Sequence, residues 1–177
     1  MSVDERLIEV IAGCKAGRAE AFSQLVDLYA SRCYGYFYRL TGDRNLSDDL
    51  LSKLFVRLLE KIGSYKGGTF ERWLFRIAGN IFYDHLRRQQ RQKKLLEQKR
   101  REFSVESQPE EKPDFDTVEK LQVQLAKLDS ETRELIMLRF YSQLSFREIA
   151  DIRRRPLGTV LAKVHRGLKK LRELMEE

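Results

Sequence analysis

The sequence predicts an all-α protein made of two small helical domains joined by a flexible acidic linker. Apolar residues recur at three- and four-residue steps over most of the chain, and no stretch is a good candidate for a strand. Two of the three prolines, Pro109 and Pro113, stand in an acid-rich stretch with few apolar residues, which is typical of a linker. The predicted units are a helical domain over 1–98, a linker over 99–117 and a second helical domain over 118–177.

The net charge of +7 is unevenly distributed over the 177 residues. Residues 1–101 carry 20 basic and 12 acidic side chains, residues 102–119 carry one basic and seven acidic, and residues 120–177 carry 13 basic and eight acidic. Two basic bodies on an acidic connector suggest two contacts with one polyanion, although solubility alone is an alternative explanation. No uncharged apolar run approaches the roughly 18 residues that span a bilayer, so no membrane insertion is expected. The acidic N-terminus lacks an apolar signal core, which favours a cytoplasmic location.

The sequence offers no catalytic or metal-binding constellation. Cys14 and Cys33 stand in helical patterns and are expected to be buried thiols in a reducing compartment. His85 and His165 are far from each other and from both cysteines, so neither a metal nor another cofactor is expected. Without paired carboxylates, an activated nucleophile or a phosphate-binding glycine motif, we expect no enzymatic activity.

Helices are predicted over residues 4–13 and 19–40, with a glycine-containing turn between them. The second helix carries a core stripe at three- and four-residue steps. Its neighbouring aromatic residues suggest either a stacking platform or core packing, and the helical spacing favours the core: Tyr34, Tyr36, Phe37 and Tyr38.

A third helix is predicted over residues 47–62, capped by Ser47 or Asn45. Basic residues spaced by four fall on its exposed side at Lys53, Arg57 and Lys61. This side is either plain solvated surface or a docking face for a large partner.

A glycine-rich loop over 63–69 leads into a long fourth helix over 70–98. One side of this helix is apolar, from Trp73 to Leu86, and the other is mostly polar and basic. Gly79 within the helix costs around 1 kcal/mol relative to alanine, which indicates a close contact there. The basic run over 87–101 would be stabilised by phosphate neutralisation.

The C-terminal part is predicted to be helical over 118–128 and again from about 130 to Phe140, followed by a helix-turn-helix over 145–171. Ser145 and Glu148 form a capping box at the start of its first helix. Pro156 then opens a second helix, which carries a basic outer face and would enter the DNA major groove. An ordinary helical hairpin with a solvated basic face is the alternative.

Two stretches together resemble the extracytoplasmic-function (ECF) type of bacterial sigma factor, group 4 of the sigma-70 family. Residues 70–88 resemble the family's promoter-melting region, and residues 128–160 resemble its C-terminal DNA-binding domain. The resemblance implies a region 2-like bundle, a region 4-like helix-turn-helix, binding to core RNA polymerase and promoter DNA, and transcription initiation. It also implies an anti-sigma factor as a partner.

The resemblance also implies three groups of site residues. Those expected at the minus-10 element and the melted strand are Tyr65, Lys66, Arg72, Arg76, Asn80, Asp84, Arg87 and Arg88. Those expected at the minus-35 element are Arg153, Arg154, Arg155, Thr159, Lys163 and Arg166. Those expected on core polymerase are Asp49, Lys53, Arg57 and Lys61.

The sequence departs from the family pattern at four places. It has Ser52-Lys53 where Gln-Glu is usual, Gly79 where arginine is usual, Arg153-Arg154 where Leu-Gly is usual, and Leu161-Ala162-Lys163 where Lys-Ser-Arg is usual. If the turn needs a left-handed residue at 154, arginine costs about 1 kcal/mol more than glycine there. Two other functions therefore stay open: a helix-turn-helix regulator that does not bind polymerase, and a sigma-like adaptor that binds polymerase without opening promoters.

Overall fold

The computed structural model describes residues 3–100 and 117–176, and every regular element in these ranges is helical. The N-terminal half contains α1 (Val3–Lys15), α2 (Ala19–Thr41), α3 (Arg44–Lys61), the short 3-10 turn η1 (Ile62–Ser64) and α4 (Phe70–Arg100). The C-terminal half contains α5 (Thr117–Ala126), α6 (Ser130–Ile136), the π-helical turn η2 (Met137–Tyr141), α7 (Phe146–Arg153) and α8 (Leu157–Glu176). The predicted fold class is thereby confirmed. Residues 101–116, which hold most of the predicted linker, lie outside the described residues.

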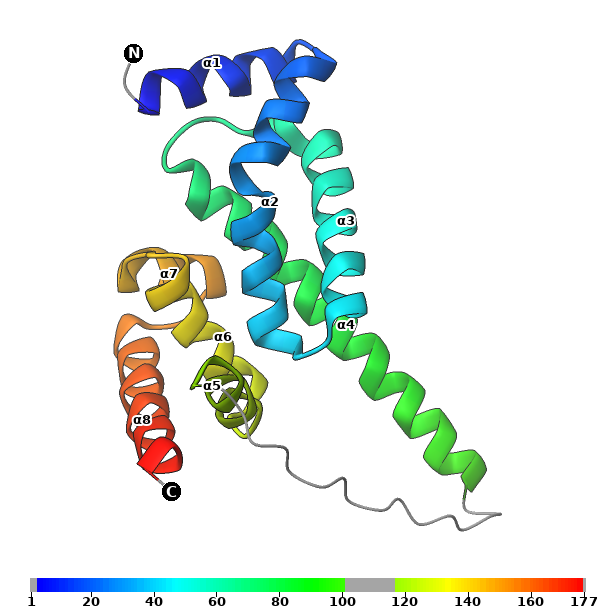
Figure 1. Ribbon diagram of the computed structural model, residues 1–177, viewed down its shortest axis with the longest axis vertical. Helices are drawn as coiled ribbons and strands as arrows, with labels where there is room; N and C mark the ends of the chain where they lie inside the picture. Colours follow the sequence, from blue (N-terminus) through cyan, green and yellow to red (C-terminus); the bar gives the residue numbers. More distant parts are fainter. Residues whose placement is uncertain (1–2, 101–116, 177) are drawn as a thin grey trace.

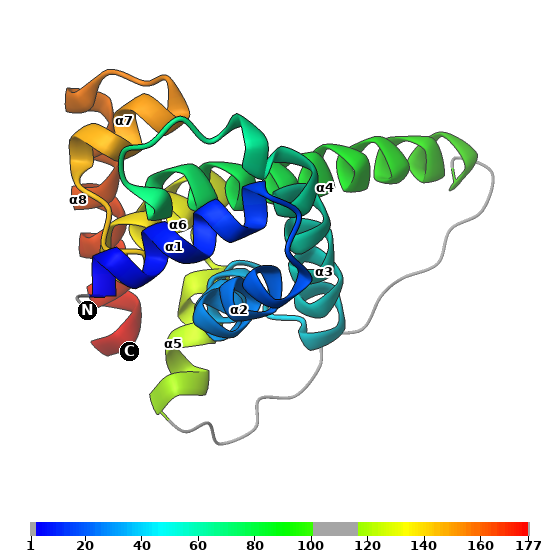
Figure 2. The same ribbon diagram turned by 90° about the horizontal axis from the view of Figure 1, so that it is seen from above.

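In the N-terminal half, α2, α3 and α4 pack side by side and α1 lies across one end of them (Figure 1). Tyr36, Phe37 and Phe75 are fully buried at the centre of this bundle. Tyr34 and Tyr38 stack on each other at the half-buried edge of α2, with ring centroids 6.2 Å apart. Tyr36 and Phe37 therefore pack in the core, as predicted. The C-terminal part of α4 projects beyond the bundle (Figure 2).

The start of α3 corrects the predicted cap. Asp43, rather than Ser47 or Asn45, is the N-cap: its backbone is extended, and its carboxylate accepts the N–H of Leu46 at 3.0 Å. Ser47 instead lies buried inside the helix and donates its hydroxyl to the Asp43 carbonyl. The helix begins earlier than predicted because an aspartate in extended backbone satisfies the first free N–H groups.

The helix-turn-helix forms as predicted. The side chain of Ser145 accepts the Glu148 N–H, and the Glu148 carboxylate accepts the Ser145 N–H at 2.8 Å, which completes the capping box. Arg154 ends α7 in the left-handed conformation, with φ 50° and ψ 47°. The turn therefore keeps the geometry that favours glycine although arginine occupies it.

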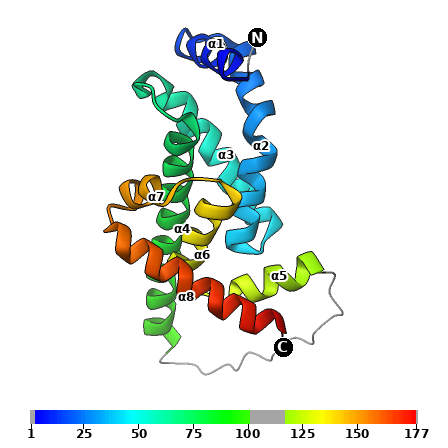
Figure 3. The same ribbon diagram turned by 90° about the vertical axis from the view of Figure 1, so that its left-hand side faces the viewer.

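The two halves lie against each other. Helices α6 and α7 rest beside α2 and α4, while α8 lies on the far side of α6 (Figures 1 and 3). Within the described ranges, no helix is long and apolar enough to span a membrane.

Candidate nucleic-acid and polymerase interface

The outer face of α4 presents a row of polar and basic side chains. Arg76, Asn80 and Asp84 follow one another at four-residue steps, so they lie along one side of the helix, and all three are exposed. Arg87 pairs with Asp84 at 3.5 Å, and both are mostly exposed. This face of α4 can contact a nucleic-acid strand along several turns.

The loop before α4 is held in place by an aromatic cluster. Gly67 and Gly68 both have positive φ, at 100° and 88°, which glycine adopts without a Cβ penalty. The Tyr65 ring is buried, 5.4 Å from the rings of both Phe70 and Trp73. Its hydroxyl donates to the Gly68 carbonyl. The loop is thus preformed, and the predicted contact residue Tyr65 is one of its supports.

Helix α1 forms the other wall of a hollow beside this loop. Lys15 donates to the Tyr65 carbonyl at 2.6 Å, and its ammonium lies 5.4 Å from the centre of the Tyr65 ring. The hollow has a volume of about 780 Å³ and is lined by the loop together with apolar residues of α1, including Leu7 and Ile11. Lys66 stands exposed at its rim.

The basic face of α8 is partly engaged within the C-terminal half. Thr159 and Arg166 are exposed, whereas Lys163 is half-buried and paired with the carboxylate of Glu131. The same glutamate also pairs with Arg155, at 3.3 Å. Glu131 therefore ties the recognition helix to the start of α6.

The three arginines of the turn have different surroundings. Arg153 is buried against Glu134, whereas Arg154 and Arg155 are exposed. All three line a cleft of about 520 Å³ that also contains Arg76 and Asn80 of α4. The structure thus brings predicted minus-10 and minus-35 residues into one cleft.

The polar face of α3 is exposed. Asp49, Lys53, Arg57 and Lys61 are all exposed, and Arg57 pairs with Glu60 at 3.0 Å. A groove of about 440 Å³ separates this face from α4, where it is lined by Ile81, Asp84, His85 and Arg88. Burial, together with the nearby charges of Lys53 and Arg88, lowers the pKa of His85, so this histidine is neutral near pH 7.

The sequence did not reveal the buried network around Glu134. Glu134 is fully buried on α6, pairs with Arg153 and accepts the Tyr36 hydroxyl at 2.9 Å. The Arg153 guanidinium lies 4.9 Å from the centre of the Tyr83 ring of α4. Burial raises the pKa of Glu134, and the positive charge of Arg153 opposes this shift. One feature of the sequence could have indicated that Glu134 is buried. Glu134 precedes the apolar Leu138 by four residues, and this spacing places its carboxylate on the buried side of the helix.

The two cysteines are buried thiols, as predicted. Burial raises the pKa of Cys33 to about 12, and burial also raises the pKa of Cys14. Among the described residues, no group of histidine, cysteine and carboxylate side chains has the arrangement of a metal site.

Comparisons with known proteins agree with this geometry. The Sigma-70 region 2 family matches residues 25–92, and the Sigma-70 region 4 family matches residues 119–171. The chain is 34% identical over 158 residues to the ECF RNA polymerase sigma factor SigE of Mycolicibacterium smegmatis, covering 88% of this chain and 62% of that protein. It is 31% identical to the RNA polymerase sigma factor CarQ of Myxococcus xanthus, covering 91% and 92% of the two chains.

A solved structure shares the fold. The sigma factor RpoE from Bartonella quintana, in complex with the anti-sigma factor NepR, superposes with a TM-score of 0.72 at 24% identity and covers 89% of this chain and 98% of that one. The helical architecture and the two region matches define a sigma-70-type transcription factor. More specifically, the chain belongs to the ECF group of sigma factors.

Proposed function

We propose that this chain is an alternative sigma factor that binds core RNA polymerase, recognises a promoter and helps to open it in the cytoplasm. The observation that carries the proposal is the α4 face, where exposed Asn80 and Asp84 stand between arginines on the helix that follows a preformed glycine loop. Opening DNA requires the capture of bases that have left the stack, and polar groups beside a closely approaching backbone suit that task. The role requires no chemical step by this chain, so we assign no catalytic residue.

On this proposal, residues 1–98 act at the minus-10 element and on polymerase. Asn80 and Asp84 read base edges, while basic side chains around them hold the phosphates. The phosphate contacts are assigned to Lys66, Arg72, Arg76, Arg87 and Arg88. Tyr65 acts by holding the loop in its shape, because its ring is buried.

The second domain, residues 118–177, acts at the minus-35 element. Thr159, Lys163 and Arg166 share one face of α8, which is the second helix of the helix-turn-helix and suits the major groove. We also assign phosphate contacts to Arg154 and Arg155, which are exposed at the turn. The remaining exposed face, Asp49, Lys53, Arg57 and Lys61 on α3, is assigned to core polymerase. An anti-sigma factor is a further expected partner.

Run-off transcription with purified core polymerase and genomic DNA fragments tests the proposal. Discrete transcripts that appear only when this protein is added are the expected result, and their start sites identify the promoters. Co-elution with core polymerase without transcripts would instead support the adaptor function, for which the exposed positive charge of Lys53 is the motivating observation. The absence of both transcripts and co-elution would contradict the proposal and would leave a DNA-binding regulator as the remaining function.

A further inference from the structure

We propose that the two halves of this chain form a closed, self-inhibited state, held by two side chains of the C-terminal half that insert into glycine notches on α2 and α4. The inhibitory part of this inference rests on the proposed function, whereas the closed state itself does not. The notches are Gly35 with Tyr141, and Gly79 with Arg153.

The first notch lies on α2. A Cβ atom at Gly35 would overlap the hydroxyl group of Tyr141, and the other side chain nearby is the flexible Arg39. The guanidinium of Arg39 lies 4.4 Å from the centre of the Tyr141 ring and covers it. Tyr141 ends the π-helical turn η2, a wide turn of the kind that recurs at functional sites. The absence of a side chain at position 35 therefore lets this tyrosine reach the backbone of α2.

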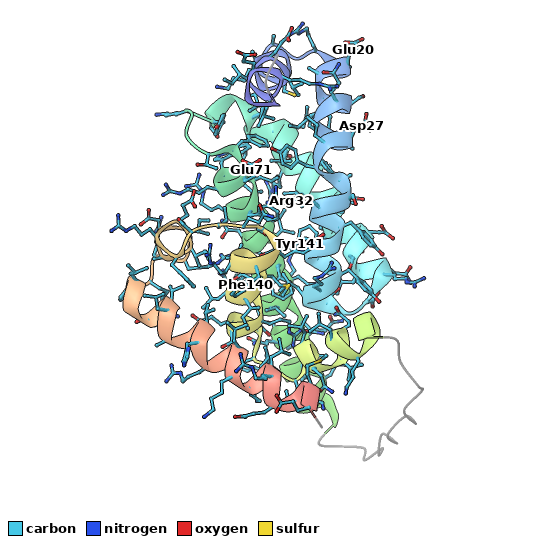
Figure 4. All side chains as sticks on the ribbon, turned by 60° about the vertical axis from the view of Figure 1, so that its left-hand side comes forward. Glu20, Asp27, Arg32, Glu71, Phe140 and Tyr141 are labelled. Atoms are coloured by element: carbon cyan, nitrogen blue, oxygen red, sulfur yellow. The ribbon has the colours of Figure 1, made fainter. Side chains whose placement is uncertain are left out.

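Polar contacts surround this first notch. Arg32 of α2 donates to the Ser142 carbonyl at 2.7 Å, and Figure 4 shows Arg32 and Tyr141 close together where α2 meets the C-terminal half. Further along α2, the side chain of Gln122 donates to the Tyr38 carbonyl at 2.9 Å, and Arg133 donates to the Leu40 carbonyl. These bonds join the last turns of α2 to the C-terminal half.

The second notch lies on α4. A Cβ atom at Gly79 would overlap the guanidinium of Arg153 and the carboxylate of Glu134, which supply its nearest neighbouring atoms. These two side chains pair with each other, and α2 and α4 cover them with Tyr36 and Tyr83. An ion pair withdrawn from water is stable only with good geometry and further hydrogen bonds. The N-terminal half supplies one of these bonds, from the Tyr36 hydroxyl, so the charged pair fits the closed state.

Closure is incompatible with reading both promoter elements. The minus-35 and minus-10 elements are about 25 base pairs apart, which is about 85 Å along B-DNA. In the closed state, Asn80 of α4 and Arg154 and Arg155 of the turn line a single cleft. A duplex cannot present both elements to one cleft, so the halves must separate before promoter binding. The open fraction then limits the apparent affinity for any partner that needs the open state.

Alanine substitutions at the notches test this inference without altering the C-terminal half. Alanine favours a helix more than glycine does, and the atoms nearest to the new methyl groups belong to the opposite half or to the flexible Arg39, so the N-terminal bundle should remain folded. Gly158→Ala is the matched control, because position 158 lies in a helix with nothing within 4 Å. The variants to compare are Gly35→Ala, Gly79→Ala and the double substitution, each in the full chain.

Small-angle X-ray scattering of the free proteins measures closure directly. The wild type and Gly158→Ala should match the closed arrangement, whereas the double variant should have a larger radius of gyration with unchanged helix content by circular dichroism. Equal radii for the double variant and the wild type would overturn the closed state. This readout involves neither polymerase nor promoter, so it stands even if the proposed function fails.

Affinity of the free protein for a promoter duplex that carries both elements measures inhibition, because the α3 face assigned to polymerase stays exposed in the closed state. If about nine-tenths of the free molecules are closed, opening them should tighten the apparent Kd of the double variant about tenfold relative to wild type. A larger radius of gyration with an unchanged Kd would overturn the inhibitory role. If neither the wild type nor the variants bind, the proposed function is contradicted. The radius of gyration from scattering would then still test whether the free protein is closed.

Discussion

The guanidinium of Arg153 lies in the space that a side chain at position 79 would occupy. Gly79 and Arg153 are both positions at which the family resemblance led us to expect another residue, and they are far apart in the chain. The glycine leaves α4 without a side chain at this position, and the arginine of α7 fills the resulting space. The pair also connects α4 to the helix-turn-helix.

Alanine at Asn80 or at Asp84 is expected to weaken recognition of the minus-10 strand. Loss of a base contact costs about 1–3 kcal/mol, so the affinity of the holoenzyme for a non-template minus-10 oligonucleotide should fall about 5- to 150-fold. Binding to core polymerase should not change. Fluorescence anisotropy with labelled oligonucleotide measures the effect, and Gln89→Ala, an exposed substitution on the same helix, is the control. Equal losses for all three variants would remove the two residues from the reading face.

Lys163→Ala is expected to weaken minus-35 binding and to lower its salt dependence. Removal of one phosphate-contacting charge reduces the slope of log K against log salt by about 1. Lys169→Ala is the matched control, because the Lys169 side chain is 75% exposed and its partner, Glu173, lies on the same helix α8. Titrations of a minus-35 duplex at several salt concentrations measure both quantities. An unchanged slope for Lys163→Ala would exclude a phosphate contact by this lysine.

Ser145→Ala is expected to destabilise the C-terminal half by about 1 kcal/mol, because it removes the side-chain part of a capping box. In a protein of this size, that loss corresponds to a decrease of about 2–4 °C in Tm. Ser31→Ala, at an exposed position inside α2, should have little effect. Calorimetry of the three proteins at pH 7 makes the comparison.

The contribution of this cap should also depend on pH. Burial raises the pKa of Glu148, but the hydrogen bonds from Ser145 outweigh burial, so the pKa lies below its ordinary value. A lowered pKa stabilises the fold above the unfolded value, near 4, and this stabilisation is lost as the pH falls through the folded pKa. The difference between wild type and Ser145→Ala should therefore shrink below about pH 4. A constant difference down to pH 3 would argue against the Glu148 carboxylate as part of the cap.

Cys33 is expected to resist alkylation in the native protein. Its pKa of about 12 leaves almost no thiolate at pH 8, and the side chain has no solvent exposure. Iodoacetamide at pH 8 should modify Cys33 only after denaturation in urea, as mass spectrometry of the alkylated peptides would show. Rapid modification in the native state would mean that the core of α2 opens frequently.

The helices and the capping box were predictable because they depend on local patterns. The apolar stripe predicts α2 from residues three or four positions apart, and the capping box is predicted from Ser145 and Glu148 alone. The start of α3 was misplaced because aspartate and serine are both good caps and only the backbone conformation decides between them. Contacts between distant segments, such as Tyr36 with Glu134, leave no periodic signal. Gly79 indicated that something lies close to α4, but the sequence could not show that the neighbour is Arg153.

Permanganate footprinting on a promoter found by run-off transcription tests the central claim most directly, because it detects thymines that have left the duplex. With core polymerase and this protein, thymines at the minus-10 element should become reactive, and they should stay unreactive with polymerase alone. The combined Asn80→Ala and Asp84→Ala variant should bind polymerase but open little or no DNA. Reactive thymines without this protein, or unchanged opening by the combined variant, would contradict the account.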